Sequence, residues 1–352
     1  MMRKIIDSKA NSRYIGNLPE GCQQCIQGEK SVLFLTGICK RGCFYCPLSE
    51  QRKDKDAMWI NEKEVKKDED IIDEIKKCGS KGVGITGGEP LNNIKRFCHY
   101  VKFLKREFGK SFHIHAYTSR TCLNREDIEN LESSGLDALR FHIFDIKKLK
   151  LKKRPRFKTA VEIPVMPKDE KRLKKLITDS DKAIDYLDYI NLNELEFSDT
   201  NAEAMAKKGF HLRDDDLYAV TGSRELSIDL LEFASENTKK ISVHFCSAST
   251  KYDYQYWNRL KRRAKNIKKP WETVTEEGLI KKGVIFGELG TSTPLFPENT
   301  FEKRDNRIET SVSNARKAAK TGIKAAIVLQ LPTDDSFDFE LTPLDCKGKE
   351  KE

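Results

Sequence analysis

The chain has 352 residues, of which 34% are charged, and a mean hydropathy of −0.63. This length allows one large core, or one core with a smaller appendage, and the high charge predicts a heavily solvated surface. No apolar run is long enough to span a membrane, and the first residues lack the apolar region of a secretion signal. We therefore expect a cytoplasmic protein without a membrane partner.

The 65 Lys and Arg residues outnumber the 55 Asp and Glu residues, which gives a net charge of +10. This surplus fits an acidic partner such as RNA. It fits equally a Lys- and Glu-rich composition in which charges of both signs are interspersed. Ten cysteines in a chain without a secretion signal favour a reducing compartment, where clustered thiols bind metal.

Residues 1–30 are predicted to form a loop-rich lead-in, broken by glycines and a proline. From residue 31 to about 200, short apolar segments alternate with amphipathic charged segments. The predicted strands are 31–36, 82–86, 112–117, 138–143, 160–165 and 189–197. Strands that alternate with helices favour parallel pairing through right-handed crossovers. We therefore predict an α/β fold whose parallel sheet curls into a full or partial barrel.

Beyond residue 200 the pattern is looser. Segment 241–247 reads as a further strand, 251–269 as a basic and aromatic helix, and 281–289 and 324–331 as later strands. No linker separates this part from the rest. We therefore predict that residues 201–352 form a C-terminal extension packed on a core of residues 31–200.

Three cysteines, Cys39, Cys43 and Cys46, follow the first predicted strand with C-x3-C-x2-C spacing. A structural zinc site usually takes four ligands, often from C-x2-C pairs. A 4Fe–4S cluster has four iron corners, so three thiolates hold three corners and leave one iron open. The cysteines lie in the loop that leaves the end of a strand, where α/β sheets place their chemistry.

A second motif, Gly87-Gly88-Glu89-Pro90, follows the second predicted strand. Adjacent glycines let a ligand approach the backbone closely, and Glu89 with exposed peptide groups can bind an amine. The alternative is a tight turn from strand to helix.

The two motifs together resemble the radical S-adenosylmethionine (SAM) superfamily, in its branch related to pyruvate formate-lyase activating enzymes. The resemblance covers roughly residues 30–200 and implies a partial (β/α)6 TIM-like barrel of the radical SAM type. It implies a 4Fe–4S cluster on Cys39, Cys43 and Cys46 whose open iron binds SAM. It also implies reductive cleavage of SAM to a 5′-deoxyadenosyl radical, which abstracts hydrogen from a substrate. A one-electron reductant of the ferredoxin or flavodoxin type is then expected as a partner.

The same resemblance implies a set of SAM-binding residues around the cluster. Tyr45 would contact the adenine through its backbone, and Thr118 ends the third strand where the family often contacts SAM. The complete implied set is Tyr45, Gly87, Gly88, Glu89, Thr118, Arg140, His142 and Glu162.

Several predicted strands carry polar residues at alternate positions. His113, His115 and Tyr117 share one face of the third strand, and Arg140 and His142 share one face of the fourth. Such side chains avoid burial unless they are paired. They either line a cavity that holds SAM or substrate, or form a structural hydrogen-bond network.

A second metal site is suggested by the pair Cys22 and Cys25 in the lead-in, with C-x2-C spacing. His244 and Cys246 could supply the other half, because alternation puts both on one face of a strand. The four would suit zinc or an auxiliary iron–sulfur cluster. The alternative is that the cysteines are free or buried apolar thiols.

Two basic runs, 147–156 and 259–265, leave further functions open, because tyrosines and a tryptophan precede the second run. Aromatic and basic side chains together suit stacked bases and phosphates, whereas the alternative is a solvated helix face. We consider three functions. They are a radical SAM enzyme acting on a protein or peptide, one that modifies tRNA, and a non-catalytic metal-binding module; a small-molecule substrate also stays open.

Overall fold

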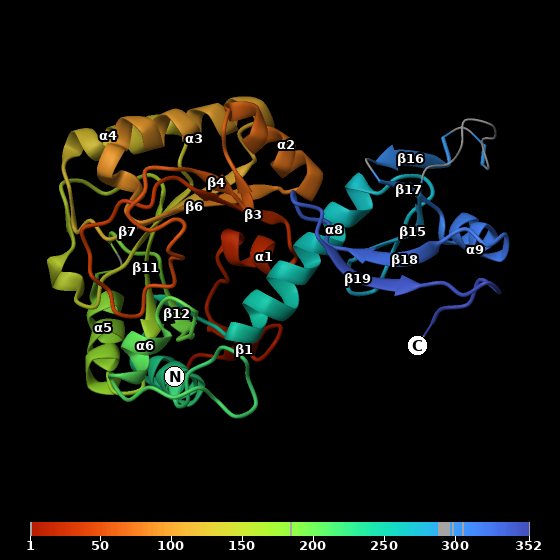
Figure 1. Ribbon diagram of the computed structural model, residues 1–352. Helices are drawn as coiled ribbons and strands as arrows, with labels where there is room; N and C mark the ends of the chain where they lie inside the picture. The colour runs from red at the N-terminus through yellow and green to blue at the C-terminus, as the bar shows by residue number, and fades with distance from the viewer. Residues whose placement is uncertain (1, 184, 288–295, 298, 305, 352) are drawn as a thin grey trace. The chain divides into compact units, whose positions relative to one another are not determined.

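The computed structural model describes residues 2–183, 185–287, 296–297, 299–304 and 306–351 (Figure 1). The chain forms two compact units. The first comprises Met1–Ile75 and Ser80–Tyr256, and the second comprises Lys76–Gly79 and Trp257–Glu352. No helix in the described part of the chain is long and apolar enough to cross a membrane.

A sheet of parallel strands forms the frame of the first unit. Its order is β3-β6-β7-β9-β11-β12-β13, and each neighbouring pair is parallel. The strands are β3 (Lys30–Phe34), β6 (Gly82–Thr86), β7 (His113–Thr118), β9 (Ala138–Phe141), β11 (Lys158–Val165), β12 (Tyr189–Glu194) and β13 (Ser242–Cys246). The predicted α/β class and partial barrel are confirmed. The six predicted strands correspond to the first six of these.

Two antiparallel hairpins cover the edges of this sheet. At one edge β2 (Arg13–Ile15) pairs with β13 and with β1 (Ile5–Asp7). At the other edge β4 (Trp59–Ile60) pairs with β3 and with β5 (Lys63–Glu64). A separate short parallel pair joins β8 (Cys122–Leu123) to β10 (Lys150–Leu151).

Most helices of the first unit follow the strands and pack on the outer face of the sheet, as Figure 1 shows for α2, α3 and α4. Helix α6 instead joins a separate apolar cluster through Met205. Their bounds are α2 (Asp68–Cys78), α3 (Ile94–Phe108), α4 (Arg125–Ser134), α5 (Glu170–Lys182), α6 (Ala202–Ala206) and α7 (Ser223–Asn237), with short turns η1 (Pro90–Asn93), η2 (Ile146–Lys148) and the π-helical η3 (Thr250–Tyr256). Local sequence sets these ends: Asn124 and Asp127 form a capping box at the start of α4, and Gly135 ends it in the left-handed region.

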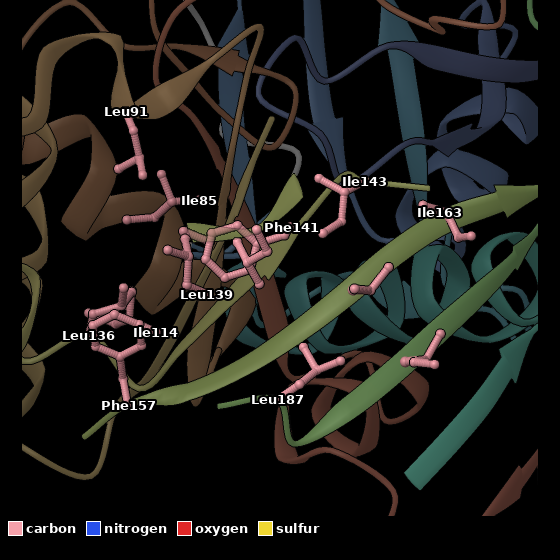
Figure 2. Packing of buried hydrophobic residues seen from close by; sticks show 14 of the residues in the cluster. Ile85, Leu91, Ile114, Leu136, Leu139, Phe141, Ile143, Phe157, Ile163 and Leu187 are labelled. Atoms are coloured by element: carbon pink, nitrogen blue, oxygen red, sulfur yellow. The ribbon is translucent and has the colours of Figure 1, made fainter. Parts of the chain in front are cut away.

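The two faces of the parallel sheet differ in polarity, because successive side chains point to opposite sides. The outer face is apolar and packs under the helices; Ile85, Ile114, Leu139, Phe141 and Ile163 belong to this core (Figure 2). The residues between them point inward and are mostly polar. The alternation read from the sequence therefore separates the core from the barrel interior.

Helix α1 (Glu20–Ile26) lies against the inward face of the sheet. A Cβ built on Gly21 would come within 2.5 Å of the His115 ring, so only glycine allows this approach. Residues 1–30, predicted as a loop-rich lead-in, thus contribute α1 and the strands β1 and β2.

The predicted core of residues 31–200 lies within the first unit, which continues to Tyr256. The reason is β13, which adds a seventh parallel strand to the sheet beside β12. The compact unit therefore runs past the predicted boundary at residue 200, and residues 201–256 complete the barrel unit.

The second unit contains α8 (Trp257–Ile267) and an antiparallel sheet of order β16-β17-β15-β18-β19, with β14 paired to β15. Its strands are β14 (Thr273–Val274), β15 (Ile280–Phe286), β16 (Phe301–Arg304), β17 (Arg307–Thr310), β18 (Ala325–Gln330) and β19 (Asp338–Pro343). Helix α9 (Val312–Lys320) packs on β15 and β18. A small core that includes Ile285, Ile327 and Ala315 holds this unit together.

Candidate active site

The cysteine loop leaves the carboxyl end of β3 and packs on the loop that follows β6. The amide of Gly88 donates to Thr36 O at 2.6 Å, and the amide of Glu89 donates to Ile38 O at 3.0 Å. A Cβ on Gly87 would lie 2.4 Å from Thr36 O, and one on Gly88 would lie 2.5 Å from Ile38 O. Because neither glycine carries a Cβ, the backbone at Thr36 and Ile38 can lie directly against them. This backbone contact fixes the start of the cysteine loop.

Glu89 is buried, with 3% of its surface exposed, and its carboxylate joins the loops after β6 and β7. One oxygen accepts from the Thr118 hydroxyl at 2.7 Å and from the Leu91 amide at 3.1 Å. The other accepts from the amide and the hydroxyl of Ser119, both at 2.6 Å. Four protein donors thus hold this carboxylate, so its role is to position the loops around the site. Thr118 is predicted to contact SAM, and here it binds Glu89.

Two aromatic residues anchor the far end of the cysteine loop. Phe44 stacks on Phe210 with ring centroids 5.9 Å apart, within an apolar cluster that also contains Met166, Leu195, Met205 and Val220. The carbonyl of Tyr45 accepts from Asn201 Nδ2 at 3.1 Å. The loop is therefore tied down at both ends, by the Gly-Gly segment and by this cluster.

The Tyr45 hydroxyl and the His142 ring form a hydrogen bond whose direction follows from their neighbours. His142 Nδ1 lies 3.1 Å from the Glu162 carbonyl, which can only accept, so Nδ1 carries the proton. His142 Nε2 therefore accepts from the Tyr45 hydroxyl, at 2.8 Å. Burial lowers the pKa of His142, which agrees with a neutral ring. This pair connects the cysteine loop to the carboxyl end of β9.

The three cysteines of the loop fit a metal cluster. All ten cysteines lie in the described part of the chain and are free thiols, and Cys39, Cys43 and Cys46 are partly exposed. Burial, together with the nearby Glu89, Cys43 and Cys46, raises the pKa of Cys39 although the Arg41 amide opposes this. Such thiols become stable thiolates when a cationic metal binds them.

Among the described residues, no three His, Cys, Asp or Glu side chains converge as ligands of a single metal ion. This holds for the loop cysteines and for every other group of such residues described.

The interior of the barrel encloses a cavity of about 240 Å³. It lies between α1, the inward face of the strands and η3. Its polar and sulfur-bearing lining comes from Cys22, Cys25, Lys30, Thr86, Tyr117, Arg140, Glu162, Asn191, Asn193, His244, Cys246, Thr250, Lys251 and Gln255. Of the predicted SAM-binding residues, Arg140 and Glu162 line this cavity.

An ion pair between Arg140 and Glu162 crosses the cavity wall, with Nη1 and Oε2 2.6 Å apart. Asn191 and Asn193 donate to the same carboxylate at 2.8 and 3.1 Å. Burial opposes the charge of Glu162, but Arg140 and the two amides more than offset it and lower its pKa to about 2. The pair is charged at neutral pH and holds β9, β11 and β12 together on their inward face.

Cys22, Cys25, His244 and Cys246 all line this one cavity. Cys22 Sγ lies 3.5 Å from Arg140 Nη2 and 3.6 Å from Asn191 Nδ2. Burial opposes ionisation of Cys22, but Arg140 and His244 more than offset it and lower its pKa to about 6. Burial raises the pKa of Cys25 and of Cys246. The two predicted halves of a second site thus meet in the barrel interior.

Comparison with known proteins identifies the family. The model of the radical SAM superfamily matches residues 33–176. A Methanocaldococcus jannaschii protein, whose name places it among glycyl-radical enzyme activating enzymes, is 37% identical over 360 residues, 94% of each chain. The chain belongs to the radical SAM superfamily. The 7-carboxy-7-deazaguanine synthase of Clostridium acetobutylicum is 38% identical over 68 residues, 18% of this chain and 27% of that protein.

Membership in the radical SAM superfamily establishes an enzyme that uses a 4Fe–4S cluster and SAM. The family implies that Cys39, Cys43 and Cys46 hold the cluster, and their free thiols and fixed loop fit this role. The interpretation as a non-catalytic metal-binding module is therefore wrong for the chain as a whole.

Part of each basic run is engaged within the protein. In the first, Lys153 and Arg156 pair with Glu132, and Arg154 pairs with Asp188. In the second, Arg259 and Arg263 are buried, with 6% and 2% of their surface exposed. These residues serve the fold, whereas the four lysines at the start of the first run are exposed: Lys147, Lys148, Lys150 and Lys152.

Sequence reasoning missed several residues that hold this radical SAM site together. Ser119 and Asn201 bind the Glu89 side chain and the Tyr45 carbonyl across long sequence separations, which no local pattern indicates. Asn191 and Asn193 had a detectable signal, because they alternate with apolar residues in a buried strand. Lys30, at the start of β3, had no signal beyond its charge.

Proposed function

We propose that this radical SAM enzyme is an activating enzyme, which abstracts a hydrogen atom from a glycine in the backbone of a partner protein. The main support is the relative that covers 94% of the chain and carries the name of such an enzyme. The cysteine loop, fixed at the carboxyl ends of the strands, is consistent with this proposal, because an active site there is open to a protein substrate.

In this proposal Cys39, Cys43 and Cys46 hold the 4Fe–4S cluster, and no protein ligand occupies the fourth iron. When bound, the cluster supplies the electron that cleaves SAM to methionine and a 5′-deoxyadenosyl radical. Gly87, Gly88 and the backbone around them would receive the methionyl end of SAM. Glu89 would fix that segment through its four hydrogen bonds.

Further residues would orient SAM from the opposite side of the site. The Tyr45 backbone would contact the adenine, and the Tyr45–His142 hydrogen bond would hold the loop for that contact. Thr118, Arg140 and Glu162 complete the proposed set, and the first acts by positioning Glu89.

Two partners belong to the proposal. A ferredoxin or flavodoxin would deliver the single electron, and a protein with a glycine to be activated would be the substrate. We also propose a second metal site at Cys22, Cys25, His244 and Cys246, for zinc or an auxiliary iron–sulfur cluster.

The test uses the enzyme reconstituted anaerobically with iron and sulfide, then mixed with SAM, dithionite and a purified glycyl-radical enzyme labelled with deuterium on its glycines. We expect a glycyl-radical signal by electron paramagnetic resonance and deuterium in the 5′-deoxyadenosine. If 5′-deoxyadenosine forms without label and no glycyl radical appears, the proposed substrate class is wrong.

The Cys43→Ala variant checks the cluster assignment, because one iron corner then loses its thiolate. We expect SAM cleavage to fall at least about 100-fold, since the reducing electron comes from the cluster. Mass spectrometry of 5′-deoxyadenosine measures this loss, and Cys122→Ser, at an exposed cysteine, is the matched control. Undiminished cleavage in Cys43→Ala would remove Cys43 from the site.

A further inference from the structure

Two elements far apart in the sequence bring four metal-ligand side chains to one cavity. Cys22 and Cys25 lie three residues apart on α1, so they share one face of the helix. His244 and Cys246 lie two residues apart on β13, so they share its inward face. All four line the cavity of about 240 Å³ in the barrel interior. One water molecule needs only about 10–15 Å³ of such space, so the cavity admits a much larger group.

The orientation of His244 follows from a chain of hydrogen bonds. The Glu162 carboxylate can only accept, so the atom of Asn191 that lies 2.8 Å from it is the amide nitrogen. The amide oxygen of Asn191 therefore faces His244, at 3.3 Å from Nδ1. His244 Nδ1 must carry the proton that bonds this oxygen. The lone pair of the ring is thus on Nε2.

His244 Nε2 is buried and has no hydrogen-bond partner of good geometry among the described residues. The residue as a whole is 2% exposed. A buried acceptor without a partner costs free energy unless something else engages its lone pair. A proton on Nδ1 held by a neighbour, with Nε2 left free, is the arrangement that metal-binding histidines adopt.

The charges around the cavity favour an anionic occupant. Three cations line it: Lys30, Arg140 and Lys251. Two of them pair with carboxylates, Arg140 with Glu162 and Lys251 with Glu196. Lys30 is buried, and its Nζ lies 3.4 Å from Nε2 of His115. A metal cluster held by cysteine thiolates is anionic, and this surplus positive charge would offset it.

The size of the cavity leaves room for a cluster. Among the described residues no group of three or more His, Cys, Asp or Glu side chains is arranged to hold a single metal ion, so the arrangement of these four gives no support to a zinc ion. The cavity of about 240 Å³ that they line admits a larger group.

We infer that the barrel interior holds a second iron–sulfur cluster, bound by Cys22, Cys25 and Cys246 with His244 as the fourth ligand. The enzyme then contains two one-electron centres in its first unit. Arg140 and Asn191 lie beside Cys22, where donors to a ligand sulfur tune the reduction potential of a cluster. This inference rests on the proposed second metal site and names the group that it binds, and it does not depend on the identity of the substrate.

The test removes the SAM-binding cluster and asks what remains. In Cys39→Ala/Cys43→Ala/Cys46→Ala, reconstituted anaerobically with iron and sulfide, we expect about half of the iron and sulfide of the wild type. The wild type should hold about eight irons per chain, as two clusters of four. Adding Cys22→Ser and Cys25→Ser to the triple variant should lower iron at least tenfold. Adding Cys122→Ser instead should leave it unchanged.

Three results would overturn the inference: about four irons per wild-type chain, zinc in place of iron, or iron that persists after Cys22→Ser/Cys25→Ser. His244→Gln keeps the inference testable if those variants fail to fold. In the triple-alanine background it should change the electron paramagnetic resonance spectrum of the reduced cluster, and an unchanged spectrum would remove His244 from the ligand set. SAM cleavage by the wild type reports on the other cluster, so failure here is distinguishable from failure of the proposed function.

Discussion

At the scale of single residues, the site depends on carboxylates that are fully occupied by the protein itself. Glu89 was expected to bind an amine, yet its two oxygens accept from Thr118, Leu91 and Ser119. A buried carboxylate with four donors is well stabilised and costly to alter. We therefore expect Glu89 to act on SAM binding through the loops that it joins.

The Glu89→Gln variant tests this positioning role. The new amide group would face donors where an acceptor is needed, so we expect a loss of about 1–3 kcal/mol in stability. We also expect about tenfold weaker SAM binding, corresponding to about 1.4 kcal/mol. Thermal unfolding and equilibrium dialysis measure the two effects. Glu126→Gln, at an exposed glutamate, is the control, and equal behaviour of both variants would contradict the role.

The Arg140–Glu162 pair predicts a specific dependence of stability on pH. Glu162 has a pKa of about 2 in the folded protein against an ordinary value of 4.5. A carboxyl with a depressed folded pKa stabilises the fold above pH 4.5, and this stabilisation is lost as the pH falls toward 2. Its full size is about 3 kcal/mol, as an upper value.

Urea unfolding of the metal-free, full-length protein measures this pH-dependent stability. Glu162→Gln should be less stable than the wild type by up to about 3 kcal/mol at pH 6. At pH 3 the difference should shrink to less than half, because the unfolded carboxyl is then mostly protonated in the wild type. A difference that stays constant between the two pH values would show that the carboxylate charge is not the cause.

Part of this site could be read from the sequence. Polar residues at alternate positions of buried strands predicted the inward face, and Arg140, His142 and Glu162 came from that reasoning and from the family resemblance. Partners such as Ser119 and Asn201 could not be predicted. Their contacts depend on which loops meet at the end of the sheet, and that is decided by the whole fold.

At the scale of elements, two loops form one structural piece. The Gly-Gly segment after β6 donates two backbone hydrogen bonds to the segment that leads into the cysteines. Backbone contacts of this kind leave no room for a side chain at Gly87 or Gly88. The motif therefore supports the cysteine loop through its backbone contacts.

Gly88→Ala and Gly42→Ala make a matched pair for this claim. The added Cβ at position 88 would lie 2.5 Å from Ile38 O, whereas one at Gly42 has no heavy atom within 4 Å. We expect the first to displace the cysteine loop and lower bound iron at Cys39, Cys43 and Cys46 about tenfold. The second, inside the cysteine loop itself, should keep wild-type iron. Iron and sulfide analysis in a Cys22→Ser/Cys25→Ser background, which removes the second proposed cluster, decides, and equal iron in both would contradict the support role.

Prediction of the elements was best where the pattern is local. Strands and amphipathic helices between 31 and 200 were identified, because each carries its own periodicity. The lead-in was harder: β2 forms only by pairing with β13, more than 200 residues away, so no local signal reveals it. Helix α1 is short and lies inside the barrel, where its tertiary contacts decide its structure.

At the scale of the whole molecule, the chain has two compact units with separate apolar cores. The proposed SAM site and the interior cavity both lie in the first unit. A ligand stabilises the part of a protein that binds it, by about 2.7 kcal/mol at a concentration 100 times its dissociation constant. Stabilisation by SAM should therefore be unequal between the units.

Hydrogen exchange measured by mass spectrometry tests this on the reconstituted enzyme. SAM should slow exchange in peptides from β3, β6 and β7, by up to about 100-fold where exchange needs opening of the whole unit. Peptides from β15 and β18 should exchange at the same rate with and without SAM. Equal protection of both units would mean that the second unit takes part in SAM binding.

The hairpin of β1 and β2 has a practical consequence for work with this protein. Its strand β2 pairs with the edge of β13, the strand that carries His244 and Cys246. A purification tag or a fusion partner that displaces the first fifteen or so residues would leave the edge of β13 unpaired. A strand of a neighbouring molecule could then pair with that edge. Recombinant versions are therefore better tagged at the other terminus.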